Sequence, residues 1–205
     1  RLLLMNAAFK KENGKFFEDW PKQKPTLAIV ITGRQDGYLE PCGCAGLERM
    51  KGGLMRRHTF LEQLREQWGW PVVAVDAGGL IKGFGRQTEL KFQTTVNSFL
   101  RMGYDAIGFG RGELRLPTGE LVSVAAGAGG KPSPFVSANV GLFGLASGLT
   151  STKRIIEAGG KKIGVTAILG AGYQKEIHNA DIEFAPPEDA IRKVLPELKK
   201  ENCDL

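Results

Sequence analysis

The chain has 205 residues, of which 42% are hydrophobic and 24% charged, so it is long enough for one large α/β domain with a real core. Its 28 basic and 22 acidic residues give a net charge of +6. This mild excess is dispersed along the chain, without a basic stripe interleaved with aromatic residues, which argues against nucleic-acid binding. No run of 18 apolar residues is present, so we expect no membrane-spanning segment.

Continuous apolar runs of strand length recur along the chain, as is typical of strands buried on both faces of a sheet. Residues 1–26 precede them and are interpreted as an N-terminal arm with one short helix near Phe16–Trp20. The predicted strands are Leu27–Ile31, Val72–Val75, Ala106–Phe109, Phe135–Ala138 and Ile163–Leu169.

Segments with helical spacing of apolar residues alternate with these runs. They predict helices over residues 54–68, around Phe92–Leu100 with Gly103 at the left-handed C-terminal position, and after Pro186-Pro187. The strand–helix–strand order favours an α/β sheet with crossover helices. A hairpin over residues 154–163, with its turn at Gly159-Gly160, is predicted as an addition to that plan.

The chain has three cysteines, Cys42, Cys44 and Cys203, and an odd number does not make a disulfide framework. Cys42 and Cys44 are two thiols separated by one residue, which could bind a soft metal, form a strained disulfide, take part in redox chemistry or remain free. The sequence leaves these alternatives open. No Cys-x-x-Cys-His motif is present, so no covalently attached c-type haem is expected.

Several segments, in their order along the chain, resemble a known family. They are Ile29–Thr32 followed by Gly37–Pro41, Gly52–Thr59, Met102–Ile107, Ser137–Val140 and Lys162–Val165. Together they are similar to the N-terminal domain of bacterial 5'-nucleotidases and UDP-sugar hydrolases, in the calcineurin-like metallophosphoesterase superfamily. The resemblance covers residues 27–205 and implies an α/β fold: a metallophosphoesterase-like sandwich of β-sheets flanked by helices. Because the family continues beyond the helix that follows Pro187, the sandwich is expected to be C-terminally incomplete.

Active members of this family hold two divalent metal ions, and the resemblance locates the corresponding positions here. The Asp and His of the family's first loop correspond to Arg34 and Asp36, and the bridging Asp of its second loop corresponds to Gly79. The Asn and His of its third loop correspond to Arg111 and Gly112. Arginine has no lone pair to offer a metal and glycine has no side chain, so these positions are degenerate and only Asp36 could still ligate.

The replaced ligands imply no catalytic residue, no bound metal and no cofactor in this chain, and they argue against an enzyme. Two interpretations of the arginines stay open. In one, Arg34 and Arg111 restore positive charge to the loop ends and bind a small anion. In the other, they pair with Asp36, Glu113 or Asp76 and only fill the old cavity, because buried charges need partners.

The segment Glu40–Cys44 resembles a bacterial subgroup of the family whose first loop reads Glu-Pro-Cys-Gly-Cys and some of whose members are joined to multihaem cytochrome regions. This resemblance implies a catalytically degenerate 5'-nucleotidase-like domain that acts as a binding or assembly module in an envelope redox complex. Its expected partner is another protein subunit such as a multihaem cytochrome, and its expected location is periplasmic or extracytoplasmic. The alternative is an active metal-dependent phosphohydrolase or nucleotidase whose ligands a missing segment supplies.

Overall fold

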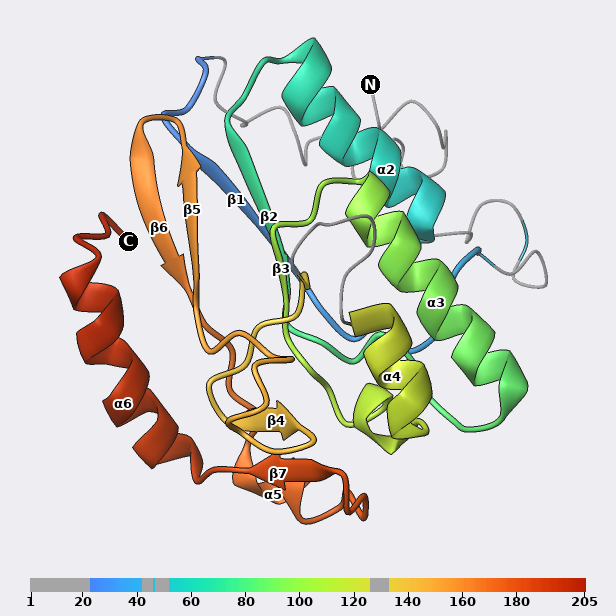
Figure 1. Cartoon of the computed structure of the whole chain (residues 1–205). Helices are drawn as coiled ribbons and strands as arrows, with labels where there is room; N and C mark the ends of the chain where they lie inside the picture. The colour runs from blue at the N-terminus through green and yellow to red at the C-terminus, as the bar shows by residue number, and fades with distance from the viewer. Residues whose placement is uncertain (1–22, 42–45, 47–51, 126–132) are drawn as a thin grey trace.

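The structure is a computed structural model that describes residues 23–41, 46, 52–125 and 133–205 (Figure 1). Two predicted features therefore lie outside the described residues. They are the short helix of the N-terminal arm and the pair of thiols of Cys42 and Cys44.

A three-stranded parallel sheet forms the centre of the fold, with its strands in sequence order. Its strands are β1 (Ala28–Thr32), β2 (Val72–Asp76) and β3 (Ala106–Ile107). The register pairs Thr32 with Asp76 and Asp76 with Ile107, so the three strands end at one edge. The loops that follow them must meet there, at the edge where α/β sheets bind ligands.

Helices cover one face of this sheet (Figure 1). The helical elements on that side are α2 (Leu54–Glu62) with its π-helical extension η4 (Gln63–Gln67), α3 (Arg86–Arg101) and α4 (Thr118–Ala125). Helix α3 contributes Phe92, Val96 and Phe99, all fully buried, to the core beneath it. The burial of three large apolar side chains from one helix face explains why this segment is helical and where it packs.

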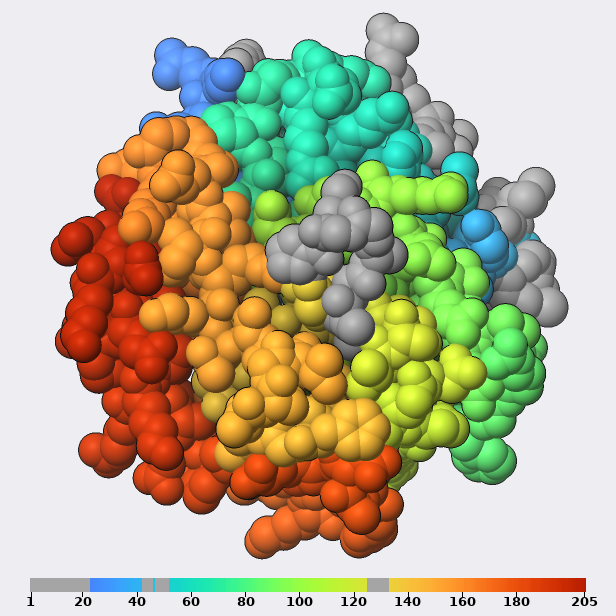
Figure 2. Space-filling model, in the orientation of Figure 1, coloured from blue at the N-terminus to red at the C-terminus, as the bar shows by residue number. Residues whose placement is uncertain are grey.

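A β-hairpin covers the other face, where β5 packs against β2 (Figure 1). It consists of β5 (Arg154–Ala158) and β6 (Lys161–Val165), joined by Gly159 and Gly160 with φ of 59° and 72°. Two consecutive positive φ angles suit glycine and the twist of a tight hairpin. Helix α6 (Pro187–Lys200) lies beside the hairpin, on the same side of the molecule (Figure 2).

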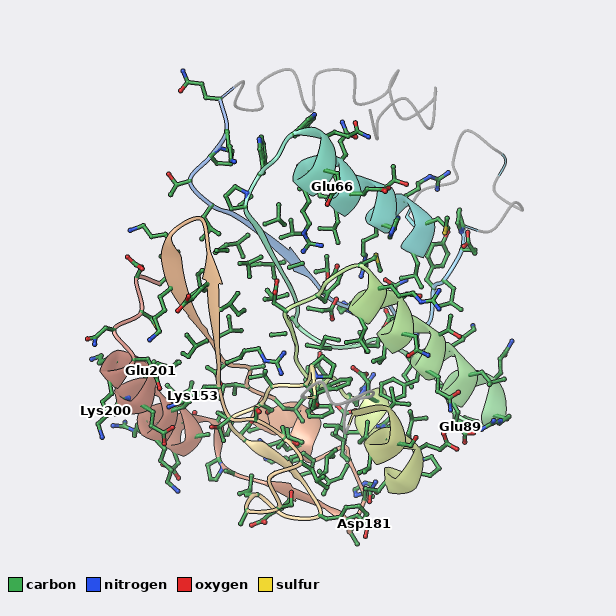
Figure 3. The ribbon with its side chains drawn as sticks, turned by 45° about the horizontal axis from the view of Figure 1, so that its top comes forward. Glu66, Glu89, Lys153, Asp181, Lys200 and Glu201 are labelled. Atoms are coloured by element: carbon green, nitrogen blue, oxygen red, sulfur yellow. The ribbon has the colours of Figure 1, made fainter. Side chains whose placement is uncertain are left out.

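Ion pairs join α6 to the hairpin region. Lys153 contacts Glu197 at 3.1 Å and Glu201 at 3.9 Å, so the start of the hairpin and the end of the helix are linked (Figure 3). These pairs are partly exposed, and each is expected to contribute less than about 1 kcal/mol.

A second small sheet closes the end of the molecule below the hairpin (Figure 1). It pairs β4 (Val140–Leu142) antiparallel with β7 (Ile182–Phe184), and the short helix α5 (Ala171–Gln174) lies beside it. The fully buried Asn139 amide donates to the carbonyl of Leu169 at 2.8 Å and accepts from the Leu169 N–H at 2.9 Å. These two bonds fix the loop that follows β6 and leads into α5.

The predicted strands and helices are confirmed in type for most of the chain, with four differences. The strand expected over Ile163–Leu169 runs instead from Lys161 to Val165, where its pairing with β5 ends at Arg154. The strand expected over Ala106–Phe109 ends at Ile107, because the chain then enters the third loop, where Gly110 lies against the main chain of Gly78 and Gly79. The strand expected over Phe135–Ala138 makes only isolated bridges. The helix expected over 54–68 is α-helical only to Glu62 and then π-helical. The elements α4, α5, β4 and β7 were not predicted.

The apolar pattern of the sequence predicts no membrane-spanning segment. Within the described ranges, no helix is long and apolar enough to cross a membrane.

Candidate functional site

The loops that follow β1, β2 and β3 touch one another through their main chains. The N–H of Arg34 donates to the carbonyl of Gly78 at 2.8 Å, and the N–H of Asp36 donates to that of Gly79 at 2.9 Å. The second and third loops approach so closely that a Cβ on Gly78 would lie 2.5 Å from the nitrogen of Gly110. The sequence therefore needs glycine at this contact, and the three loops form one rigid rim.

These loops line an open cleft of about 660 Å³. The loop after β6 and the helix α5 supply the opposite wall, including Leu169 and Tyr173. Four basic side chains line the cleft, Arg34, Lys82, Arg111 and Arg115, against one acidic side chain, Asp36. The structure thus brings together in one cleft the five positions singled out in the sequence, which are Arg34, Asp36, Gly79, Arg111 and Gly112.

The first loop presents its side chains to the cleft from a strained backbone. Arg34 and Asp36 have positive φ angles of 54° and 51°, in the left-handed region that non-glycine residues rarely adopt. The Arg34 side chain is 88% exposed, and its guanidinium lies 3.8 Å from the carboxylate of Asp36, whose side chain is 43% exposed. A pair this long and this solvated holds Arg34 only weakly, so its guanidinium is accessible from the cleft.

The third loop presents a cation that is held more firmly. Arg111 forms an ion pair and hydrogen bond with Glu176, and its guanidinium carbon lies 5.6 Å from the centre of the Tyr173 ring. We expected Asp36, Glu113 or Asp76 as possible partners of the two arginines. For Arg111 that expectation is wrong, because Glu113 and Asp76 are engaged beneath the loops. Sequence spacing gave no signal for Glu176, 65 residues away.

Glu113 braces the second and third loops from below. Its side chain is fully buried, and its Oε1 accepts hydrogen bonds from the main-chain N–H groups of Gly79 at 2.8 Å and Gly110 at 3.1 Å. Burial raises the pKa of the Glu113 carboxyl above its usual value, against the opposing effect of these main-chain donors. Its role here is to hold two loops together, since the side chain has no access to the cleft.

Asp76, at the end of β2, anchors the first and second loops in the same way. It accepts hydrogen bonds from the Gly78 N–H at 2.8 Å and the Thr32 hydroxyl at 2.5 Å. Arg57 of α2 lies 3.8 Å from the Asp76 carboxylate and donates to Gln35 of the first loop at 2.6 Å. Burial raises the pKa of Asp76, and the two hydrogen bonds and Arg57 act in the opposite direction.

Arg57 is a site-supporting residue that the sequence analysis missed. It sits next to Arg56 in an apparent surface pair, but its guanidinium lies 5.0 Å from the centre of the Phe99 ring and its side chain is only 20% exposed. The sequence offered one signal for it. Asp76 ends a buried strand, and a buried aspartate needs a partner somewhere in the fold.

The residues at this edge do not fit a pair of divalent metal ions. Arg34 and Arg111 offer no lone pair, and the positive φ of 78° at Gly79 disfavours any side chain there. A Cβ on Gly112 would lie 1.9 Å from the carbonyl oxygen of Ile81, so the main chain leaves no room for a histidine. Within the described ranges, no group of three His, Cys, Asp or Glu side chains could hold a metal ion. Cys42 and Cys44 stay outside this test.

The architecture defines the class of fold. The loops at the carboxyl ends of a three-stranded parallel sheet form the cleft, with helices on one face of the sheet and a hairpin on the other. The chain has the α/β fold of the calcineurin-like metallophosphoesterases, so the predicted fold class is confirmed and the resemblance is confirmed at the level of the fold. The Glu-Pro-Cys-Gly-Cys subgroup stays a prediction. Among solved structures it is similar to a 5'-nucleotidase precursor from Thermus thermophilus, with 22% identity and a TM-score of 0.70 over 87% of this chain.

Two further solved structures have the same fold. The NAD nucleotidase of Haemophilus influenzae is 17% identical, with a TM-score of 0.64. The calcineurin-like phosphoesterase YfkN of Bacillus subtilis is 18% identical, with a TM-score of 0.65, and each comparison covers 87% of this chain. Identities this low establish the fold alone. The chain spans 35% of the Thermus protein, 33% of the Haemophilus protein and 60% of the Bacillus protein. No family model matches the sequence, and no curated protein matches it.

Proposed function

We propose that this chain is a catalytically degenerate 5'-nucleotidase-like domain that binds a small oxyanion, or an oxyanionic group of a larger ligand, without metal. The observation that carries the proposal is the charge of the cleft, which is lined by four basic side chains and by Asp36, while Glu176 beside it pairs with Arg111 and Arg115. The proposed ligand is recognised through phosphate, sulfate or carboxylate oxygens.

The arginines suit this role. A guanidinium group presents several donors in a planar fork that matches the oxygens of phosphate, sulfate and carboxylate. Arg34 and Arg111 lie on either side of the second loop, because that loop hydrogen-bonds to Arg34 on one side and contacts Gly110 on the other. An anion between them would receive charge-assisted hydrogen bonds from two loops that buried carboxylates hold in place.

Isothermal titration with inorganic phosphate, sulfate and AMP tests the proposal. Because charge-assisted hydrogen bonds contribute about 1.5–3 kcal/mol each, we expect Arg34→Ala and Arg111→Ala each to weaken phosphate binding by about tenfold or more. Arg192→Ala is the matched control, since it removes the same charge from the exposed face of α6, away from the cleft. Binding that survives both cleft substitutions unchanged would refute an anion site at these loops.

The proposal extends to assembly and location. The Glu-Pro-Cys-Gly-Cys resemblance supports a role as a module in an extracytoplasmic redox complex, with a multihaem cytochrome as partner. A similar fold occurs in a Thermus thermophilus protein described as a precursor, which supports export as part of the proposal. Purification of the native complex, followed by haem absorption spectroscopy, tests the partner. A preparation without haem-containing subunits would argue against it.

A metal-dependent phosphohydrolase remains the second candidate. It is favoured by Asp36, a carboxylate that lines the cleft. Hydrolysis of bis-p-nitrophenyl phosphate or AMP with added Mn²⁺ or Zn²⁺ tests this candidate. Metal-dependent turnover that is lost in Asp36→Ala would establish it and displace the binding function.

A further inference from the structure

Two of the arginines that line the cleft already have an anionic partner, and it belongs to the protein. Glu176 follows α5, and its carboxylate pairs with Arg111. Arg115 reaches the same carboxylate oxygen, Oε2, at 3.5 Å. Two guanidinium groups from the third-loop region therefore converge on a single carboxylate oxygen.

The segment that carries Glu176 is anchored independently of this carboxylate. The guanidinium of Arg115 donates to the main-chain carbonyl of Glu176 at 3.1 Å, and the neighbouring Ile177 is buried. Gln174 donates to the carbonyl of Ala185 at 3.0 Å. The Glu176 side chain can thus leave Arg111 while its main chain stays in place, and the Tyr173 ring still supports the Arg111 guanidinium.

The pair between Arg111 and Glu176 is of the kind that an external ion can replace. Both side chains are substantially exposed, Arg111 by 41% and Glu176 by 43%. Ion pairs at such exposure are stabilised weakly, because water solvates both charges. A phosphate or sulfate brings more oxygens and more charge to the two guanidinium groups than one carboxylate does.

Resting on the anion-binding function proposed above, we propose that Glu176 is a built-in competitor for that site. Its carboxylate holds Arg111 and Arg115 and must release them before a phosphate, sulfate or carboxylate group of a ligand binds these two guanidinium groups. Arg34 and Lys82, from the first and second loops, complete the basic lining of the cleft. Glu176 thereby sets the affinity of the cleft and limits occupancy by weakly charged anions.

The sign of the effect of Glu176→Gln on affinity separates this role from a positioning role. A competitor weakens binding, so its removal strengthens binding. A residue that merely orients Arg111 assists binding, so its removal weakens it. Titration of the full chain with inorganic phosphate is expected to show about 3- to 10-fold tighter binding in Glu176→Gln, since an exposed ion pair and one opposing charge are removed. Glu176→Asp, which draws the carboxylate back, is expected to give an intermediate gain.

Two controls sharpen the test. Glu197, on α6, has a side chain of similar exposure, and its carboxylate pairs with Lys153 at 3.1 Å. Glu197→Gln removes this carboxylate and is expected to leave phosphate affinity unchanged. Arg111→Ala in the Glu176→Gln background is expected to abolish the gain. Circular dichroism melting of each variant confirms that it is folded, and Glu176→Asp serves if the glutamine variant is not.

Each outcome decides a different point. Unchanged or weaker phosphate binding in Glu176→Gln and Glu176→Asp, with measurable binding in the unsubstituted chain, overturns the competitor role and leaves the anion site intact. No binding of phosphate or sulfate by any variant overturns the anion site and the competitor together. Binding only after Glu176 is replaced supports both.

Discussion

The residues beneath the three loops and the residues on the cleft side of those loops differ in kind. Beneath the loops, Asp76 and Glu113 are buried carboxylates that accept main-chain hydrogen bonds from Gly78, Gly79 and Gly110. On the cleft side, the positions that the sequence resemblance aligns with metal ligands are mostly cations or glycines. The path of these loops therefore depends on the buried carboxylates. The side chains that the loops present to the cleft can differ while the fold stays the same.

The same contrast holds between the two cleft arginines. Arg34 is nearly free in solvent, with Asp36 3.8 Å away. Arg111 is held between Glu176 and Tyr173. One loop therefore offers an accessible cation and the other a cation already engaged, which is why the effect of Glu176 on binding is the sharper probe of the cleft.

The largest expected effect comes from the loop contact at Gly112. Gly112→Ala would place a Cβ 1.9 Å from the Ile81 carbonyl oxygen, so the main chain must shift. We expect a loss of more than about 3 kcal/mol in the free energy of unfolding, measured by urea denaturation. Gly119→Ala is the control, because nothing lies within 4 Å of a Cβ there and the position is helical. Equal stability of the two variants would mean that the loops are not locked together.

Substitution of Arg57 is expected to lower the free energy of unfolding by a smaller amount. Arg57→Ala removes the cation beside the buried Asp76 and the hydrogen bond to Gln35. We expect a destabilisation of about 2–3 kcal/mol, since an uncompensated buried carboxylate is left behind. The neighbouring Arg56 is half-buried but makes only a solvent-exposed hydrogen bond to the Gly52 carbonyl, and Arg56→Ala is expected to change stability by less than about 0.5 kcal/mol. If both substitutions had the same small effect, Asp76 would not depend on Arg57.

The smallest effect, visible only as a pH dependence, concerns Glu113. Because burial raises its pKa in the folded state, its contribution to stability is complete below the unfolded pKa of about 4.3 and is lost as pH rises through the folded pKa. Glu113→Gln keeps an acceptor for Gly79 and Gly110 but does not ionise. We expect the stability of the unsubstituted chain, relative to Glu113→Gln, to fall from acidic toward neutral pH in denaturation experiments. Parallel pH curves would show that Glu113 has no raised pKa.

Much of the fold could be predicted from local pattern. The apolar runs of β1 and β2 and the Gly159-Gly160 turn are signals that a few neighbouring residues carry, and the structure has these elements. Helix α4 was missed because it is only eight residues long and begins at Thr118-Gly119, which weakens a helical pattern. β4 and β7 are three residues each, too short for a periodic signal.

The site was harder to predict, because its contacts join distant parts of the chain. The resemblance located Arg34 and Arg111 at the ends of strands, and the structure has both at one cleft. The identity of their neighbours could not follow from spacing: Glu176 comes from a segment beyond the hairpin, and Arg57 from a helix before β2. The left-handed backbone at Arg34 and Asp36 also has no signature in their side chains.

The tight packing of Gly110 and Gly112 against the second loop has a consequence for engineering. Anyone wishing to install a metal centre here could not proceed by exchanging one side chain at a time, because a Cβ on Gly110 would fall 2.2 Å from the nitrogen of Gly79 and one on Gly112 would strike Ile81. The backbone between residues 78 and 81 would first have to be rebuilt. Conversion of this cleft into a hydrolytic centre is therefore a problem of loop redesign, with ligand substitution as its last step.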